Sequence, residues 1–289
     1  MSSVLFDVPG PRARLRYRLY AVLGGAAVLA LIGFVLYRFY DSGQFEPRMW
    51  EWVQYQQVQV ELLQRLGNTL KAFALAALAA VLLGAVLAAG RLSDHAALRV
   101  PAMVVVEIFR AIPLLIMIFL LYFGLGSAGF GFSQFMAVVV GLTLYNGSVL
   151  AEVFRAGVAS LPRGQAEAAY ALGMRKTQVM VQVLLPQALR AMLPTIISQL
   201  VVLLKDTALG FIINYEELLN YVKYLGTQGQ FGRPLVPMTI VAGAMYITMC
   251  LLLTWLATWL EKRNRRSRKV IDRDGPNAAE NVVLSNVSA

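Results

Sequence analysis

The sequence is poor in the residues from which metal sites, disulfides and catalytic centres are built. Its 289 residues include one cysteine, Cys250, and one histidine, His95. A disulfide within the chain and a zinc site of Cys and His ligands are therefore excluded, and we expect no bound metal. The G-x4-G-K-[ST] loop that binds nucleotide phosphates is also missing. Because polar residues do not cluster at a fixed spacing, a membrane-embedded enzyme is a distant alternative, and we predict no catalytic residue and no cofactor in this chain.

Charged residues are also scarce. Only 15% of the residues are charged and 58% are hydrophobic, whereas an ordinary soluble domain carries about 25% charged residues. A helix needs about 20 mostly apolar residues to cross a bilayer. Six stretches qualify, at 19–37, 70–89, 100–125, 132–150, 187–204 and 236–260. The sequence therefore predicts an all-α, polytopic membrane helical bundle with about six transmembrane helices.

Three of these stretches have features that a simple span lacks. The stretch 100–125 contains Glu107 and Arg110, which we expect to form an intrahelical or interhelical ion pair that anchors the inner end of the span. It also contains Pro113, which predicts a kink or a break between half-helices. The stretch 187–204 runs directly into charged residues. The stretch 19–37 follows four arginines, as the core of a signal peptide does. It is long for such a core and no convincing A-x-A cleavage site follows, so we expect a retained helix.

Lysine and arginine are unevenly distributed over the connections. The two chain ends and the second and fourth connections hold eighteen of them, and the other three connections hold six. Because basic connections stay in the cytoplasm, both termini are predicted to be cytoplasmic. The net charge of +10 then mostly reflects orientation, with some charge near 262–269 left for anionic lipid headgroups, and nucleic acid is not an expected partner. Residues 271–289 are predicted to be disordered.

One polar segment, QAEAAYALGMRKTQVMVQVLLPQ at 165–187, is longer than a connection between two spans has to be. Its first part predicts a short helix over 165–172 with a face of small residues, and Gly173 permits a turn. A second apolar stripe over 179–184 follows before Pro186 opens the next span. Periodicity alone leaves two interpretations open. The segment is either a cytoplasmic knob for a partner or a surface loop whose apolar face packs against its own bundle.

The spacing within this segment resembles that of a known family. EAA at 167–169 is followed after three residues by Gly173 and after nine more by VLLP at 183–186. This resembles the EAA loop of ABC importer membrane subunits, EAA-x3-G-x9-I-x-LP, with Val183 in place of isoleucine. Other stretches are similar to the polar amino acid uptake branch of that family, the histidine, glutamine and glutamate type: GNTL at 67–70, FRAIPLL at 109–115, YFG at 122–124, SLPRGQ at 160–165 and LKDTAL at 204–209.

The resemblance covers roughly residues 65–262 and implies three parts. Residues 1–64 would form a cytoplasmic N-terminal arm, an added transmembrane helix and an extracytoplasmic connection. Residues 65–262 would form the transmembrane domain of the importer, and residues 263–289 a basic, then disordered, cytoplasmic tail. Members of this branch commonly have five spans with the N-terminus outside. One added helix restores the cytoplasmic N-terminus that the charge distribution indicates.

In this family the loop is a coupling helix seated in a groove of the ATPase subunit. The resemblance therefore implies that coupling to ATP hydrolysis involves Glu167, Ala168, Ala169, Gly173 and Pro186. ATP and magnesium would be bound by that separate ATP-binding subunit. A second permease subunit, identical or different, and an extracytoplasmic amino-acid-binding protein would be further partners, beside membrane lipid. The chain would be a multi-pass protein of the bacterial cytoplasmic membrane and not itself an enzyme.

The implied substrate is a polar amino acid, with glutamate or aspartate preferred to glutamine or basic amino acids. A zwitterion needs both a cation and an anion or carbonyl along its path, and ionisable groups inside a membrane commonly mark such a path. The candidate pathway residues are Lys205, Asp206, Thr207, Glu107 and Arg110. Asn146 and Ser148 are expected to be interhelical hydrogen-bond partners instead.

Lys205 and Asp206 have a second interpretation, in which they pair with each other and bind nothing. Their depth depends on the start of their helix. A start at Pro194 places them near the middle of the bilayer, and a start at Gln187 places them at its outer surface. The competing functional class is a channel or an ATP-independent secondary transporter, which would use the same helices but has no need of a protruding loop for an ATPase.

Overall fold

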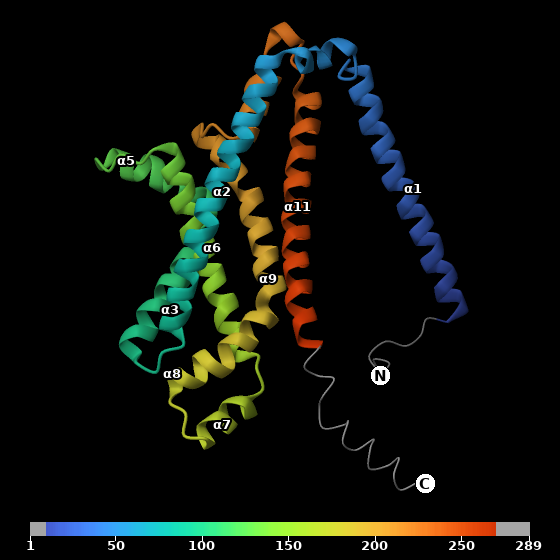
Figure 1. The fold of residues 1–289 in the computed structure, drawn as a ribbon. Helices are drawn as coiled ribbons and strands as arrows, with labels where there is room; N and C mark the ends of the chain where they lie inside the picture. The colour runs from blue at the N-terminus through green and yellow to red at the C-terminus, as the bar shows by residue number, and fades with distance from the viewer. Residues whose placement is uncertain (1–9, 270–289) are drawn as a thin grey trace.

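The computed structural model describes residues 10–269, shown in Figure 1. The described chain is helical and contains no strand. Its elements, in order, are α1 Pro11–Asp41, η1 Pro47–Gln54, α2 Gln56–Arg91, α3 Ala96–Ala111, α4 Leu114–Phe119, η2 Leu120–Gly124, α5 Leu125–Ser127, α6 Gln134–Ala159, α7 Arg163–Ala171, α8 Lys176–Gln178, η3 Val179–Leu184, α9 Leu185–Asp206, η4 Thr207–Ile213, α10 Leu218–Gly226, η5 Gly229–Phe231 and α11 Leu235–Lys269. The prediction of an all-α membrane bundle is confirmed.

Five helical stretches of the described chain are long and apolar enough to cross a membrane. They are α1, α2, α6, the run from α8 to η4 (Lys176–Ile213), and α11 as far as Trp259. A sixth span arises if α3 and the segment from α4 to α5 count as one broken span, since the two halves meet at 98°. Ile112, between them, has an extended backbone, as expected for a residue that precedes a proline. The predicted break at Pro113 is therefore confirmed.

The helices α2 and α6 pack closely because small residues lie where they cross. Ala72, Ala76 and Ala80 of α2 are fully buried at helical spacing. Below them, a Cβ added to Gly84 would lie 2.9 Å from the Cβ of Leu150, so a side chain there would push the helices apart. In a bilayer, where lipid is as apolar as leucine, such close backbone approach is a main source of helix association.

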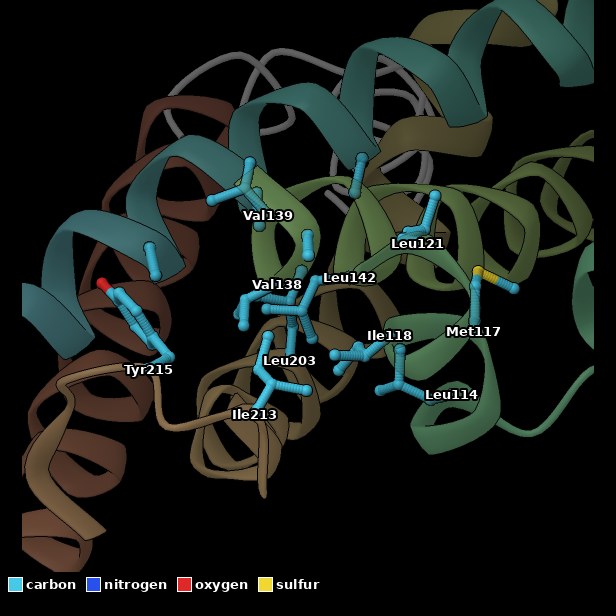
Figure 2. Close-up of a cluster of buried hydrophobic side chains, with 14 of the residues drawn as sticks. Leu114, Met117, Ile118, Leu121, Val138, Val139, Leu142, Leu203, Ile213 and Tyr215 are labelled. Atoms are coloured by element: carbon cyan, nitrogen blue, oxygen red, sulfur yellow. The ribbon is translucent and has the colours of Figure 1, made fainter. Parts of the chain in front are cut away.

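A buried apolar cluster fixes the broken segment to the rest of the bundle (Figure 2). Ile118 of α4 packs against Gly141 of α6, at a distance that leaves no room for a Cβ on that glycine. Leu142 of α6 and Leu203 of α9 are fully buried in the same cluster, as is Ile213 at the end of η4. Since this core joins α4, α6, α9 and η4, it positions the irregular segments at which the chain departs from straight spans.

The N-terminal part is joined to the bundle by one short element. None of the residues of α1 is buried, and Figure 1 shows this helix standing apart from α2 and α11. The following η1 inserts Trp52, which is 2% exposed, among residues of α10 and α11. α1 begins, and α11 ends, on the side of the bundle where α7 and α8 lie (Figure 1). The predicted disorder of 271–289 concerns residues outside the described range.

Candidate functional sites

The segment with the EAA spacing folds into α7, a tight turn and α8 at one end of the bundle (Figure 1). Gly173 has φ +78°, a conformation that costs a side-chain-bearing residue free energy, and the amides of Gly173 and Met174 donate to the carbonyls of Tyr170 and Ala169. No atom lies within 4 Å of a Cβ added to Gly173. The glycine is therefore required by the backbone of the turn and not by crowding.

The two faces of this segment differ in exposure. Ala169 and Val179 are buried against the chain itself, while Glu167 and Ala168 are exposed. Leu172, at the tip, is 83% exposed. One apolar face thus packs on its own bundle, as one of the two interpretations expected, and a second apolar surface is left uncovered at the tip.

The second part of the segment was predicted to end before a new span that Pro186 opens, and here the structure differs. The helix continues from α8 through the π-helical η3 into α9 without a break. Pro186 consequently lies in the first turn of α9, exposed, inside a continuous helical run, and does not open a new helix. Proline inside a helix lacks an amide donor and disturbs the preceding turn, and here the π-helical turn η3, in which the amide of Leu185 donates to the carbonyl of Met180, lies directly before it.

Lys176 of α8 connects this segment to the turn between α2 and α3. Its ammonium lies 2.5 Å from the carboxylate of Asp94 and donates to the carbonyl of Leu92, the residue that ends α2, at 3.2 Å. The hydrogen bond from Lys176 lowers the pKa of the Asp94 carboxyl. Asp94 therefore stays ionised and paired as the pH falls through the mildly acidic range.

A charge network lies just inside this turn, and it bears on one prediction. Arg91 of α2 lies 2.7 Å from a carboxylate oxygen of Glu152 of α6, in an ion pair without hydrogen-bond alignment, and 3.9 Å from Glu107 of α3. Glu152 also accepts hydrogen bonds from Arg155. Of the two predicted arrangements, the intrahelical pair of Glu107 with Arg110 is not found in residues 10–269, because Glu107 faces the end of α2 while Arg110 is exposed. The interhelical arrangement is confirmed for Glu107, through its ion pair with Arg91.

The candidate pathway residues at the end of α9 point in different directions. Lys205 is exposed, Asp206 is partly buried, and Thr207 is fully buried with its hydroxyl donating to the carbonyl of Leu204. No ion pair joins Lys205 to Asp206 in the described structure. Consecutive side chains of a helix diverge by about 100°, which accounts for this separation.

Thr207, at the end of the α9 run, lies next to a tyrosine of α11. α9 begins at Leu185, but Figure 1 shows its first part running obliquely at the end of the bundle before it turns along the axis. Thr207 lies beside the hydroxyl of Tyr246, and the helical rise to Tyr246 from the start of the apolar stretch Leu235–Trp259 is roughly 16 Å. That distance equals about half of the thickness of the bilayer core. The observed start of α9 at Leu185 lies close to Gln187, the start for which the outer surface was predicted, and the depth of Lys205 and Asp206 stays a prediction.

A buried carboxylate that also contacts Tyr246 was missed by the sequence analysis. Glu217 is fully buried and caps α10, accepting hydrogen bonds from the amides of Leu219 and Asn220 at 2.8 and 2.7 Å. The hydroxyl of Tyr246 donates to the same carboxylate at 2.8 Å. α10 is therefore a half-helix that begins inside the bundle. The signal that could have found Glu217 is an acidic residue directly before the helix-forming LLNYV.

Two polar residues of α6 behave differently from each other. The side-chain amide of Gln199 in α9 donates to Asn146 at 2.8 Å, which confirms the predicted interhelical role of Asn146. Ser148 instead donates to the carbonyl of Leu144 in its own helix. The interhelical prediction for Ser148 is therefore wrong, since a serine hydroxyl inside a helix readily bonds to the preceding turn.

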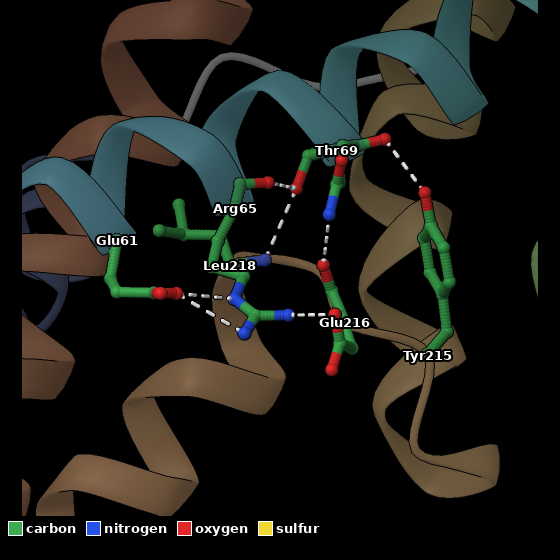
Figure 3. Close-up of polar contacts among 7 residues, drawn as sticks. Glu61, Arg65, Thr69, Tyr215, Glu216 and Leu218 are labelled. Atoms are coloured by element: carbon green, nitrogen blue, oxygen red, sulfur yellow. Dashed lines mark hydrogen bonds and ion pairs between the residues drawn. The ribbon is translucent and has the colours of Figure 1, made fainter.

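A polar cluster ties the chain between η4 and α10 to α2 (Figure 3). Arg65 of α2 pairs with Glu61 at 3.2 Å and with Glu216 at 2.5 Å. The side-chain amide of Asn68 donates to the carbonyl of Glu216, and the hydroxyl of Tyr215 donates to the carbonyl of Asn68. These contacts hold the turn before α10 at a fixed position along α2.

Two hollows flank this cluster. The larger, of about 1120 Å³, lies among α2, α10 and η5. The smaller, of about 410 Å³, is lined by Asn68, Lys71, Ser133, Gln134, Phe135, Tyr215 and Glu216. None of the five candidate pathway residues lines either hollow. Across residues 10–269, no group of three or more His, Cys, Asp or Glu side chains is close enough to hold a metal ion.

Comparison with known proteins shows the family to which this chain belongs. Residues 80–266 match the family described as binding-protein-dependent transport system inner membrane component. The glutamate transport system permease protein GluD of Corynebacterium glutamicum is 40% identical over 232 residues, which are 78% of this chain and 84% of that protein. The glutamate/aspartate import permease protein GltK of Escherichia coli O6:H1 is 34% identical over 70% of this chain and 92% of its own length. The arginine transport system permease protein ArtQ of Bacillus subtilis is 32% identical over 70% and 91%.

Solved structures agree with these sequence relationships. A crystal structure of an amino acid ABC transporter with histidines is 29% identical and matches with a TM-score of 0.67, covering 73% of this chain and 98% of that one. The inward-facing MetNI methionine ABC transporter shares the fold at 20% identity, with a TM-score of 0.60 over 72% and 98% of the two chains. The chain belongs to the family of binding-protein-dependent transport system inner membrane components, and it is the permease subunit of an ABC amino-acid importer.

Proposed function

We propose that this permease carries acidic amino acids, glutamate and aspartate, across the cytoplasmic membrane. The observation that carries the proposal is the order of similarity among its relatives. The glutamate permease of C. glutamicum is 40% identical over 78% of this chain, and a probable glutamine permease of B. subtilis is 36% identical over 55%. The glutamate/aspartate permease of E. coli, at 34% over 70%, exceeds the arginine permease, at 32% over 70%. Because the chain belongs to this family, the alternative function of a channel or an ATP-independent transporter is excluded.

The segment with the EAA spacing is proposed as the contact with a separate ATP-binding subunit, which would bind ATP and magnesium. The uncovered apolar tip at Leu172 supports this role, because a surface of this kind is typical of a protein interface. Glu167 and Ala168 are exposed beside it, and Gly173 sets the turn. The remaining proposed partners are a second permease subunit and an extracytoplasmic amino-acid-binding protein.

The division of the chain is part of the same proposal. Residues 1–64 form an added segment with its own span, 65–262 form the transport domain, and 263–289 form a basic tail in the cytoplasm. Lys205, Asp206 and Thr207 are proposed to lie along the substrate path, where Thr207 contacts Tyr246 of α11. Glu107 and Arg110 lie near the inner end of that path and are proposed to meet the substrate on exit.

The substrate assignment is tested with the permease reconstituted together with its ATP-binding subunit and its binding protein. Glutamate and aspartate are expected to stimulate ATP hydrolysis, and glutamine, arginine and histidine are expected to leave it near its basal rate. Stimulation by arginine or glutamine alone would show that the acidic substrate class is wrong while the transport function stands.

The coupling role is tested with Gly173→Val and Glu167→Lys. The first forces a β-branched residue into a left-handed backbone conformation, and the second reverses a charge on the exposed face. Both are expected to reduce amino-acid-stimulated ATP hydrolysis and uptake by about tenfold while the chain still inserts into the membrane. Gly164→Val is the matched control, since Gly164 also has open space around it but has an ordinary φ. Uptake at normal rates in both variants would reduce the segment to a connection.

A further inference from the structure

We propose that one face of α1, which carries Arg12 and Arg16, binds an anionic phospholipid. The headgroup phosphate would lie between the two guanidinium groups, and an acyl chain would lie along Leu19 and Leu23, farther along the same face. The proposal goes beyond the transport function, because α1 lies outside residues 80–266, which match the transporter family. It names the partner of a helix that the rest of the described chain leaves uncovered.

The first observation is the exposure of α1 along its length. None of its 31 residues is buried, and Figure 1 shows it standing apart from α2 and α11. An apolar helix that crosses a membrane without covering neighbours is surrounded by lipid. Its length of about 46 Å exceeds the roughly 30 Å of the hydrocarbon core. The two ends of α1 therefore extend into the headgroup layers.

Four tyrosines indicate how deeply α1 lies in the bilayer. Tyr17 and Tyr20 lie near its start, and Tyr37 and Tyr40 lie near its end, all of them exposed. The two pairs are twenty residues apart, a rise of about 30 Å that equals the thickness of the hydrocarbon core. Tyrosine prefers the boundary between hydrocarbon and headgroups. The residues that precede Tyr17 are therefore expected in the headgroup layer.

Arg12 and Arg16 bring two like charges together in that layer. They are four residues apart and so share one face of α1, separated by about 6 Å along its axis. Both are exposed, and neither forms an ion pair within residues 10–269. Like charges at this spacing repel, and the first turn of α1, where the helix dipole is also positive, contains no acidic residue. An anion bound between the two arginines would remove the repulsion.

A phospholipid supplies such an anion together with the apolar part that the rest of this face requires. Guanidinium groups bind phosphate through two parallel hydrogen bonds. Leu19 and Leu23 follow seven and eleven residues after Arg12, on the same face, and each is more than half exposed. The face thus changes from cationic to apolar in the order of a headgroup and its acyl chain. Phosphatidylglycerol, with a net negative charge, is favoured over phosphatidylcholine, whose own cation opposes the attraction.

The test uses the full-length chain in vesicles of equimolar phosphatidylcholine and phosphatidylglycerol, with one of the two lipids brominated in each sample. In a Cys250→Ala background, Ala27→Cys carries a fluorescent label on the same face, one turn beyond Leu23. Bromine on an acyl chain quenches the label on contact. Phosphatidylglycerol is expected to be enriched about fivefold over phosphatidylcholine beside the label, the factor that a single arginine near anionic lipid provides.

Arg12→Gln combined with Arg16→Gln is expected to abolish this enrichment, and Arg12→Lys combined with Arg16→Lys is expected to keep most of it. The matched control is Arg14→Gln combined with Arg18→Gln. It removes the same charge from the opposite face of α1 and is expected to retain most of the enrichment. Each glutamine variant keeps two of the four arginines, and with them the charge bias that orients the helix.

Three results would overturn the proposal. Equal quenching by the two brominated lipids in the unaltered chain would show that this face does not select anionic lipid. Equal loss of enrichment in the two glutamine variants would show that diffuse positive charge, and not the face of Arg12 and Arg16, attracts the lipid. No quenching by either lipid would show that another protein covers this face.

Discussion

Glu217 and Tyr246 show what a single polar contact does inside this bundle. The carboxylate is fully buried, and its three donors are two amides of α10 and one hydroxyl of α11. A buried charge without such partners would be strongly unfavourable, whereas a fully bonded one fixes the position of the elements that carry it. Here it fixes the start of α10 against α11.

We therefore expect Tyr246→Phe to destabilise the assembled permease by about 1–3 kcal/mol, because a buried carboxylate loses one of its donors. The measurement is the melting temperature of the purified complex in detergent. Tyr224→Phe is the control, since Tyr224 is largely exposed on the same half-helix that Glu217 caps. Equal melting temperatures for the two variants would mean that the contact of Tyr246 with Glu217 contributes nothing.

Single polar residues also show which contacts can be predicted from the sequence and which cannot. Asn146 was predicted as an interhelical partner because an amide in an apolar helix needs one, and that reasoning is local. Lys205 and Asp206 were considered as a pair because they are neighbours in sequence. The residues that do meet, Glu217 and Tyr246, are brought together only by the packing of α10 on α11, which no local pattern records.

The helices show the same difference between local features, which the sequence predicts, and long-range contacts, which it does not. Spans and the break at Pro113 follow from composition and from the chemistry of proline, so the sequence predicted them. The irregular path from η4 to α10 was not predicted, because its apolar stretches are too short to stand out as spans. Its position depends on long-range contacts such as that of Asn68 with Glu216.

One element-scale prediction concerns how movement of the α7–α8 segment would reach the membrane helices. Lys176 attaches this segment to the turn that joins α2 to α3, next to the network of Arg91. An exposed pair adds at most about 1 kcal/mol to stability, so Lys176→Asp or Asp94→Lys should leave assembly intact. Each is expected to raise the ATP hydrolysed per amino acid transported by severalfold, and the double exchange to restore the ratio.

Arg175→Asp controls for the change of charge, because Arg175 precedes Lys176 and forms no ion pair in the described structure. It is expected to keep the normal ratio. A double exchange that transports no better than the single variants would mean that the ion pair itself does not transmit the movement, and that Lys176 or Asp94 acts through some other contact.

The orientation of the whole bundle in the membrane can be tested directly. The described chain begins and ends at the end of the bundle that carries α7 (Figure 1), and the distribution of Lys and Arg predicts that this end is cytoplasmic. In a Cys250→Ala background, cysteines at Ser127 or Gln228 are expected to react with an impermeant thiol reagent added outside intact cells, and a cysteine at Ser267 is expected not to. The reverse pattern would place the α7–α8 segment outside, away from any ATPase.

The isolation of α1 bears on how proteins of this kind diverge. Because no residue of α1 is buried, a mutation within it changes no contact of the core, and its loss would require no compensating substitution elsewhere in the bundle. Gain or loss of such a leading helix would therefore leave the packing within the bundle unchanged. The match to GltK, in which 92% of the relative aligns with 70% of this chain, is consistent with an added segment in this chain.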